Sequence, residues 1–153
     1  MRLLPLWLHL LAAVVWLGGL LFESHVLFPL LARQGAMDSV AAAVNRFRRV
    51  TWTAIALMVL TGLYNLTRLP PIAQLVEGGV LKLLALKLFL VVVVLMLSAH
   101  RDFGLASRLL REVAAGRAAD QVLSAILRVD RIVLLLGMIL LYLGLALSRG
   151  GTF

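Results

Sequence analysis

The sequence predicts an all-α, polytopic integral membrane protein that folds as an antiparallel four-helix transmembrane bundle. Its 153 residues are 63% hydrophobic and only 14% charged. Four apolar runs, at about 3–31, 50–66, 80–99 and 132–147, are separated by connections of which two are strongly basic. A helix rises about 1.5 Å per residue and a bilayer core is about 30 Å thick, so each run can cross it, the shorter two with help from flanking residues. We expect residues 1–153 to form a single domain.

The first run begins after Arg2 and continues through His25 to Pro29. It is too long for the apolar segment of a signal peptide, and no clear small-residue cleavage site interrupts it. We therefore expect it to be retained as the first membrane helix. A turn at Gln34-Gly35 should follow it.

The second helix is expected to begin near Ser39, to enter lipid at Val50, and to stop before Pro70-Pro71. The third should start near Val80. Beyond residue 100 the apolar residues recur at helical spacing among charged ones, which indicates an amphipathic helix leaving the membrane. We expect a cytoplasmic helical hairpin over about 101–131, with its turn at Gly116, leading into the fourth span.

Basic residues predict the orientation of the bundle. The first and third connections hold ten arginines, and the other side of the membrane has four basic residues (Arg2, Arg68, Lys82 and Arg149). By the positive-inside rule, both basic loops are cytoplasmic, and the N- and C-termini lie outside the inner (plasma) membrane. The net charge of +8 is thus a topology signal, and we expect no nucleic-acid partner.

Several kinds of chemistry lack support in the sequence. Cysteine is absent, which excludes disulfides, thiolate metal sites and thiol nucleophiles. The sequence also contains no HExxH, GxSxG, Walker A or dinucleotide-binding glycine motif. A soluble-type hydrolase, NTPase or dehydrogenase is therefore not expected, and catalytic residues are not assigned.

Ionisable residues at membrane depth are costly, which makes them the candidates for function. His9 in the first helix and Lys87 in the third lie at similar distances from the outer face, where Asn65 could join them. Trp16 and Glu23 follow His9 at steps of seven residues, a spacing that drifts only about 20° around a helix. This stripe should face the interior of the bundle.

A second group of candidates lies nearer the cytoplasmic face. His25 lies toward the cytoplasmic end of the first apolar run, and His100 directly follows the third. These two could share a site, whereas His25 and His9 project from nearly opposite sides of one helix. The second, third and fourth helices carry Met58, Met96 and Met138 at roughly comparable depth. Imidazole and thioether groups suit Cu(I), but methionine is also a common filler between packed helices.

The order of several short motifs resembles the small copper-resistance protein D (CopD) family of membrane proteins. The motifs are the segment from His9 through Trp16 and Gly18-Gly19 to Pro29, then Arg46-Phe-Arg-Arg49, Leu60-Thr61-Gly62, and Leu86-Lys87-Leu88. The resemblance implies copper homeostasis or uptake across the membrane. This chain lacks the extra spans and the fused periplasmic domain of larger members, which favours a homo-oligomer or a larger membrane complex.

A second resemblance is to the HemJ-type protoporphyrinogen oxidase. That family's first-helix histidine and third-helix lysine would map to His9 and Lys87, with His100 following. The chain lacks the aromatic-Pro-Arg continuation expected after Gly19, and its spacing from lysine to histidine is longer. This resemblance implies haem b, with a histidine as ligand and Lys87 on a propionate.

Three functions therefore remain open at this stage. In the first, the protein handles copper and is not an enzyme, with His9, His25, Met58, Met96 and Met138 as metal ligands. In the second, it is a haem b-dependent membrane oxidoreductase whose cofactor is bound among His9, His25, Lys87 and His100. In the third, it is a non-catalytic assembly subunit that docks through the cytoplasmic hairpin.

Overall fold

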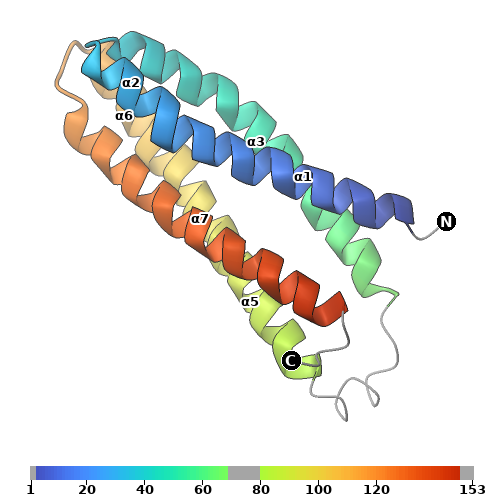
Figure 1. Ribbon diagram of the computed structural model, residues 1–153. Helices are drawn as coiled ribbons and strands as arrows, with labels where there is room; N and C mark the ends of the chain where they lie inside the picture. Colours follow the sequence, from blue (N-terminus) through green and yellow to red (C-terminus); the bar gives the residue numbers. More distant parts are fainter. Residues whose placement is uncertain (1–2, 69–79, 149–153) are drawn as a thin grey trace.

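The computed structural model describes residues 3–68 and 80–148, and these form four long helical rods. The first rod joins α1 (Leu3–Phe22), the π-helical turn η1 (Glu23–Leu27) and α2 (Phe28–Arg33). The second is α3 (Met37–Leu66). The third joins α5 (Val80–Ala99), the π-helical turn η2 (His100–Leu105) and α6 (Ala106–Ala114), and the fourth is α7 (Asp120–Ser148). Consecutive rods run in opposite directions (Figure 1), so the predicted all-α, antiparallel arrangement is confirmed.

The two predicted turns are present, and each has a backbone reason. Gly35 and Gly116 have positive φ angles of 68° and 64°, a conformation that glycine adopts without strain. In each turn the glycine N–H and the next N–H donate to carbonyls of the preceding helical turn, as Ala36 does to Leu31 at 3.0 Å. α3 begins at Met37, slightly before the expected Ser39. The predicted stop at Pro70-Pro71 lies outside the described residues.

Among the described residues, three helical stretches are long and apolar enough to cross a membrane: Leu4–Arg33, Val80–Ala114 and Asp120–Leu147. The predicted span at 50–66 is helical, but it is less apolar because threonines and Asn65 interrupt it. Large apolar side chains cover the outside of the rods, among them Val14, Leu60 and Phe89. The chain is thus a helical membrane protein whose apolar surface suits contact with lipid.

The rods are longer than a bilayer is thick. The 30 residues of α3 extend for about 45 Å, against a hydrocarbon core of about 30 Å. All four rods reach the end of the bundle where the α2–α3 turn and the α6–α7 turn lie (Figure 1). The segment 101–131 does not stand apart as an isolated hairpin, because it packs against α2 and the first half of α3.

Two apolar cores lie one after the other along the bundle. The membrane core includes Trp16, Leu20, Ile55, Val94 and Val133. The extension core joins α2, the first half of α3, α6 and the start of α7, through a set that includes Phe28, Val40, Val44, Leu109 and Ile126.

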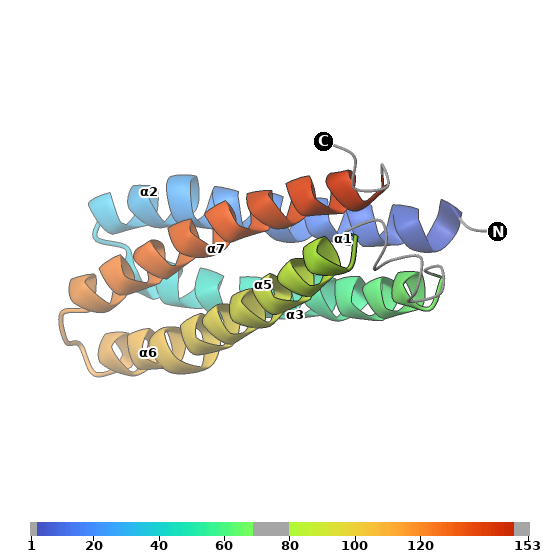
Figure 2. The ribbon, with the colours of Figure 1, turned by 90° about the horizontal axis from the view of Figure 1, so that it is seen from below.

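Helix pairing differs along the bundle. In the membrane half, α1 packs most extensively on α3, and α5 on α7. Figure 2 shows α5 inclined to the other rods, with the continuing α6 at the end near the Gly116 turn.

Candidate functional site

A buried charge cluster lies between the two apolar cores. Its members are Glu23 from η1, Arg101 and Asp102 from η2, and Asp130 from α7, and each is at most 3% exposed. Glu23 and Arg101 each lie about 30 Å along their rods, counted from the start of α1 and of α5, a length similar to the thickness of a hydrocarbon core. We call these four residues the Arg101 cluster.

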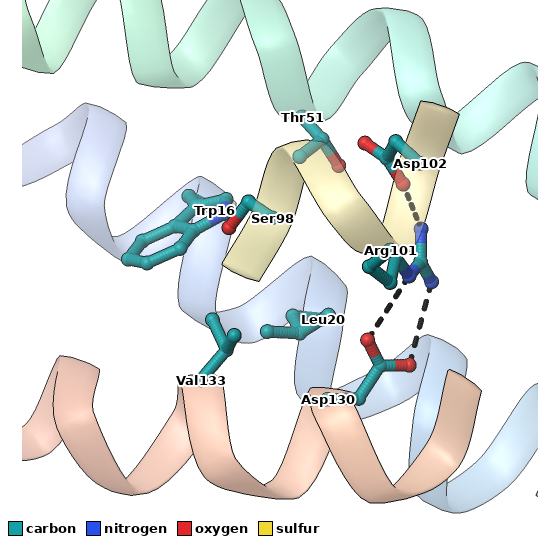
Figure 3. A pocket seen from close by; sticks show the side chains of 8 residues that line it. All are labelled: Trp16, Leu20, Thr51, Ser98, Arg101, Asp102, Asp130 and Val133. Atoms are coloured by element: carbon teal, nitrogen blue, oxygen red, sulfur yellow. Dashed lines mark hydrogen bonds and ion pairs between the residues drawn. The ribbon is translucent and has the colours of Figure 1, made fainter. Parts of the chain in front are cut away.

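Arg101 holds the cluster together through all three guanidinium nitrogens. Its Nε donates to Asp130 Oδ1 at 3.0 Å, and its Nη1 donates to Asp102 Oδ1 at 2.7 Å (Figure 3). Its Nη2 lies 3.0 Å from Glu23 Oε2 and 3.4 Å from Asp130 Oδ2. A guanidinium suits this position because its planar fork can serve several carboxylates at once. Three rods are thereby joined through one side chain.

The remaining rod, α3, contributes an indole. Trp52 Nε1, from α3, donates to Asp102 Oδ2 at 2.8 Å. A cavity of about 10 Å³ adjoins the cluster and is lined by Thr51, Ser98, Arg101, Asp102 and Asp130, together with apolar side chains of the membrane core (Figure 3). A cavity needs at least about 10–15 Å³ to hold one water molecule, so this one is at the lower limit.

The two π-helical turns supply three of the four clustered residues. Glu23 begins η1, and Arg101 and Asp102 lie in η2. A π-helical turn adds a residue to the helical repeat and occurs often at functional sites. The shift in register lets Arg101 and Asp102, which are neighbours in sequence, both point inward.

A second polar group lies around His9, and we call it the outer group after the side of the membrane on which the sequence predicts it. Its Nδ1 is 3.0 Å from the carbonyl oxygen of Met58 and 3.0 Å from Thr61 Oγ1. The Thr61 hydroxyl donates its own proton to the carbonyl of Leu57 at 2.6 Å, so it accepts from the imidazole. Both neighbours of Nδ1 are therefore acceptors, and we assign the proton to Nδ1. The lone pair of Nε2 is left available for a ligand.

Glycines leave room for the two polar side chains of this outer group. A Cβ atom on Gly62 would lie 3.4 Å from His9 Cε1, and one on Gly144 would lie 3.3 Å from Lys87 Nζ. His9 therefore packs on α3, and the Lys87 ammonium packs on α7. Both side chains are half-buried.

The other candidate residues are distributed as follows. Trp16 and Glu23 are buried, which confirms that the stripe on the first helix faces inward. Asn65 and Met58 are half-buried. His25 and His100 are exposed, and no contact joins them: the His25 ring contacts Ser24 Oγ at 2.8 Å, and the His100 ring lies over Gly104. The Met96 and Met138 side chains are 68% and 57% exposed, on the outside of the bundle.

The sequence reasoning missed most of the Arg101 cluster. Arg101 was counted among the cytoplasmic arginines, and Asp102, Asp130 and Trp52 were not candidates. One available signal was the pair Arg101-Asp102 placed directly after a long apolar run, since an adjacent pair of opposite charges can enter the bundle together.

The described residues contain no group of three or more histidine, cysteine, aspartate or glutamate side chains arranged to hold a metal ion. The Arg101 cluster has three carboxylates, but the guanidinium occupies the space between them.

The fold and its interior thus define a helical membrane protein with two polar groups, one near each end of its membrane half. Residues 41–147 match the family model of copper resistance protein D (CopD), over α3, α5, α6 and α7. The chain therefore belongs to the CopD family. No curated protein and no solved structure matches it.

Proposed function

We propose that this protein handles copper at the inner membrane, in copper homeostasis or in copper uptake. The match to the CopD family over residues 41–147 carries this proposal. In the proposed orientation both termini lie outside and the extension core lies in the cytoplasm, as the distribution of arginines favours. Copper is the substrate in this reading, and no chemical step is assigned.

His9 is the proposed point of copper contact in the outer half. A metal-binding histidine usually donates its second ring N–H to a carbonyl or carboxylate, and this fixes both the ring and its tautomer. The Nδ1–H of His9 has such partners in Met58 O and Thr61 Oγ1. Imidazole and thioether are suitable ligands for Cu(I), so the Met58 side chain is the proposed second ligand.

The remaining copper candidates have a different role in this proposal. His25, Met96 and Met138 are exposed on the surface of a single copy. They would bind copper only where a second copy of the chain or another subunit covers them. This part of the proposal therefore depends on a homo-oligomer or a larger membrane complex.

Haem b is the alternative, and one observation favours it. His9 donates through Nδ1 and so keeps Nε2 for a ligand, and Lys87 places a half-buried ammonium beside Gly144 of α7. In that case His9 would be the haem ligand, Lys87 would pair with a propionate, and the haem would supply redox chemistry. His25 and His100 would then lie on the surface, away from this pair.

The experiment tests whether variants of the protein complement a strain that lacks its gene, with the same substitution made at a control position. We compare copper tolerance and total cell copper in strains that carry wild type, His9→Gln, Lys87→Met or the control Lys82→Met. Lys82 is an exposed lysine of α5, the helix that also carries Lys87. We expect His9→Gln to fail because it removes the proposed ligand, and Lys87→Met to fail because in this proposal the ammonium controls passage of the cation by its charge. The control Lys82→Met should complement. Full complementation by His9→Gln would contradict the proposal, and co-purification with a large complex would favour an assembly subunit.

A further inference from the structure

The Arg101 cluster contains more negatively charged groups than positively charged ones. Three carboxylates surround one guanidinium, and all four side chains are buried. The formal charge is therefore −2 if every group is ionised. Uncompensated charge in a low-dielectric interior costs several kcal/mol per ion, so the cluster requires a further positive charge.

Hydrogen bonding distinguishes among the three carboxylates. Both oxygens of Asp130 accept from Arg101, and the two oxygens of Asp102 accept from Arg101 and Trp52. Glu23 differs, because its Oε2 faces Arg101 at 3.0 Å while its buried Oε1 has no partner. Hydrogen bonds to both oxygens therefore stabilise the ionised forms of Asp102 and Asp130. Glu23 has one carboxyl oxygen, Oε1, that accepts no hydrogen bond.

We propose that the Arg101 cluster is a proton-binding site, and that Glu23 Oε1 carries the bound proton in the folded protein at neutral pH. A neutral carboxyl costs less to bury than an anion, and protonation reduces the formal charge of the cluster from −2 to −1. The adjacent cavity is at the lower limit of the volume that holds one water molecule, and Thr51, Ser98 and both aspartates line it together with apolar side chains. It offers a place for the water through which such a proton could exchange.

The other groups that face the cluster do not supply the missing charge. From η1, His25 is exposed, and its ring contacts Ser24 Oγ at 2.8 Å and none of the three carboxylates. η2 contributes Arg101 and Asp102, and α7 contributes Asp130. From α3 the contact is the uncharged Trp52 indole. Since the guanidinium already lies between the carboxylates, a proton fits there and a larger cation does not.

Infrared spectroscopy of the purified protein tests this assignment directly. A protonated carboxyl has a carbonyl stretch above the amide I band, and it shifts on exchange into D₂O. We expect this band at neutral pH in wild type and in the control Glu112→Gln, which changes a surface carboxylate. The band should be lost in Glu23→Gln. Its absence from wild type at neutral pH, or its persistence in Glu23→Gln, would overturn the proposal.

The pH dependence of stability provides a second readout. An unfolded glutamate ionises near a pH of about 4.3, so at neutral pH folding would take up one proton. The folding equilibrium constant of wild type should then fall, relative to Glu23→Gln, by about tenfold per pH unit as the pH rises toward the value at which the folded site releases its proton. Parallel pH profiles, or stabilisation by Na⁺ or K⁺ in place of protons, would overturn the proposal.

Discussion

Arg101 Nη2 lies 3.0 Å from Glu23 Oε2, and this contact joins the first and third rods at the boundary between the membrane core and the extension core. Both residues lie in π-helical turns. With Asp130 on α7 and Trp52 on α3, all four rods meet at this level. The cluster therefore connects the half of the bundle that holds His9 and the membrane core to the half that holds the extension core.

Replacing Arg101 should destabilise the protein strongly. Arg101→Met leaves three buried carboxylates without their cation, and breaking a buried ion pair in this way costs about 3–5 kcal/mol. The measurement is thermal unfolding of the purified protein in detergent, with Arg117→Gln as the control. Arg117 pairs with Glu112 on the surface, so its replacement should have little effect. Equal melting temperatures for the two variants would contradict this account.

Trp52 should contribute through its N–H group. Trp52→Phe keeps an aromatic ring beside Phe103 but removes the donor to Asp102 Oδ2. A hydrogen bond to a charged group is worth about 1.5–3 kcal/mol, and we expect a loss of stability in that range. Trp7→Phe, at an exposed position of α1, provides the comparison. A Trp52→Phe protein as stable as the Trp7→Phe protein would show that the indole donor is dispensable.

Thr61 should tune copper binding without binding copper itself. Thr61→Val removes one acceptor from the His9 Nδ1–H and keeps the shape of the side chain. Loss of such a supporting partner typically lowers metal affinity by about 10–100-fold. Cu(I) affinity measured by competition with a colorimetric chelator checks this prediction, with the exposed Thr53→Val on the same helix as control. An unchanged Cu(I) affinity in Thr61→Val would contradict the proposed supporting role of Thr61.

The membrane orientation can be tested cleanly because the chain has no cysteine. Single cysteines introduced at Gln34 and Ala118 lie in the turns after α2 and α6, and one at Thr67 lies at the opposite end of the bundle. A membrane-impermeant maleimide should label only the Thr67→Cys variant in intact cells. The other two should react after the cells are permeabilised. The reverse pattern would invert the proposed topology.

The positions of the helical rods and of the two glycine turns could be predicted from the sequence, because the length of an apolar run and the backbone conformation of glycine are local properties. The inward stripe of Trp16 and Glu23 also followed from helical periodicity alone. The Arg101 cluster did not, because it depends on helix rotation and on two π-helical turns that change the register. A flanking arginine that snorkels and one that turns inward look alike in sequence.

The methionines illustrate the same limit. Met58, Met96 and Met138 have similar depths in the sequence, but depth does not determine which side of a helix faces its neighbours. Met96 and Met138 lie outside the bundle, whereas Met58 packs beside the membrane core. His9 was identified as a candidate from its depth, but its hydrogen bonds to α3 required the packing of two helices.

The most direct test of the central claim is metal analysis of the purified protein together with its reduced-minus-oxidised visible spectrum, for wild type and His9→Gln. Copper handling through His9 predicts copper bound to wild type, loss of that copper in His9→Gln, and no Soret band in either sample. A Soret band that disappears in His9→Gln would contradict the copper assignment and would establish haem at the same histidine. Equal copper in both samples would place the metal elsewhere.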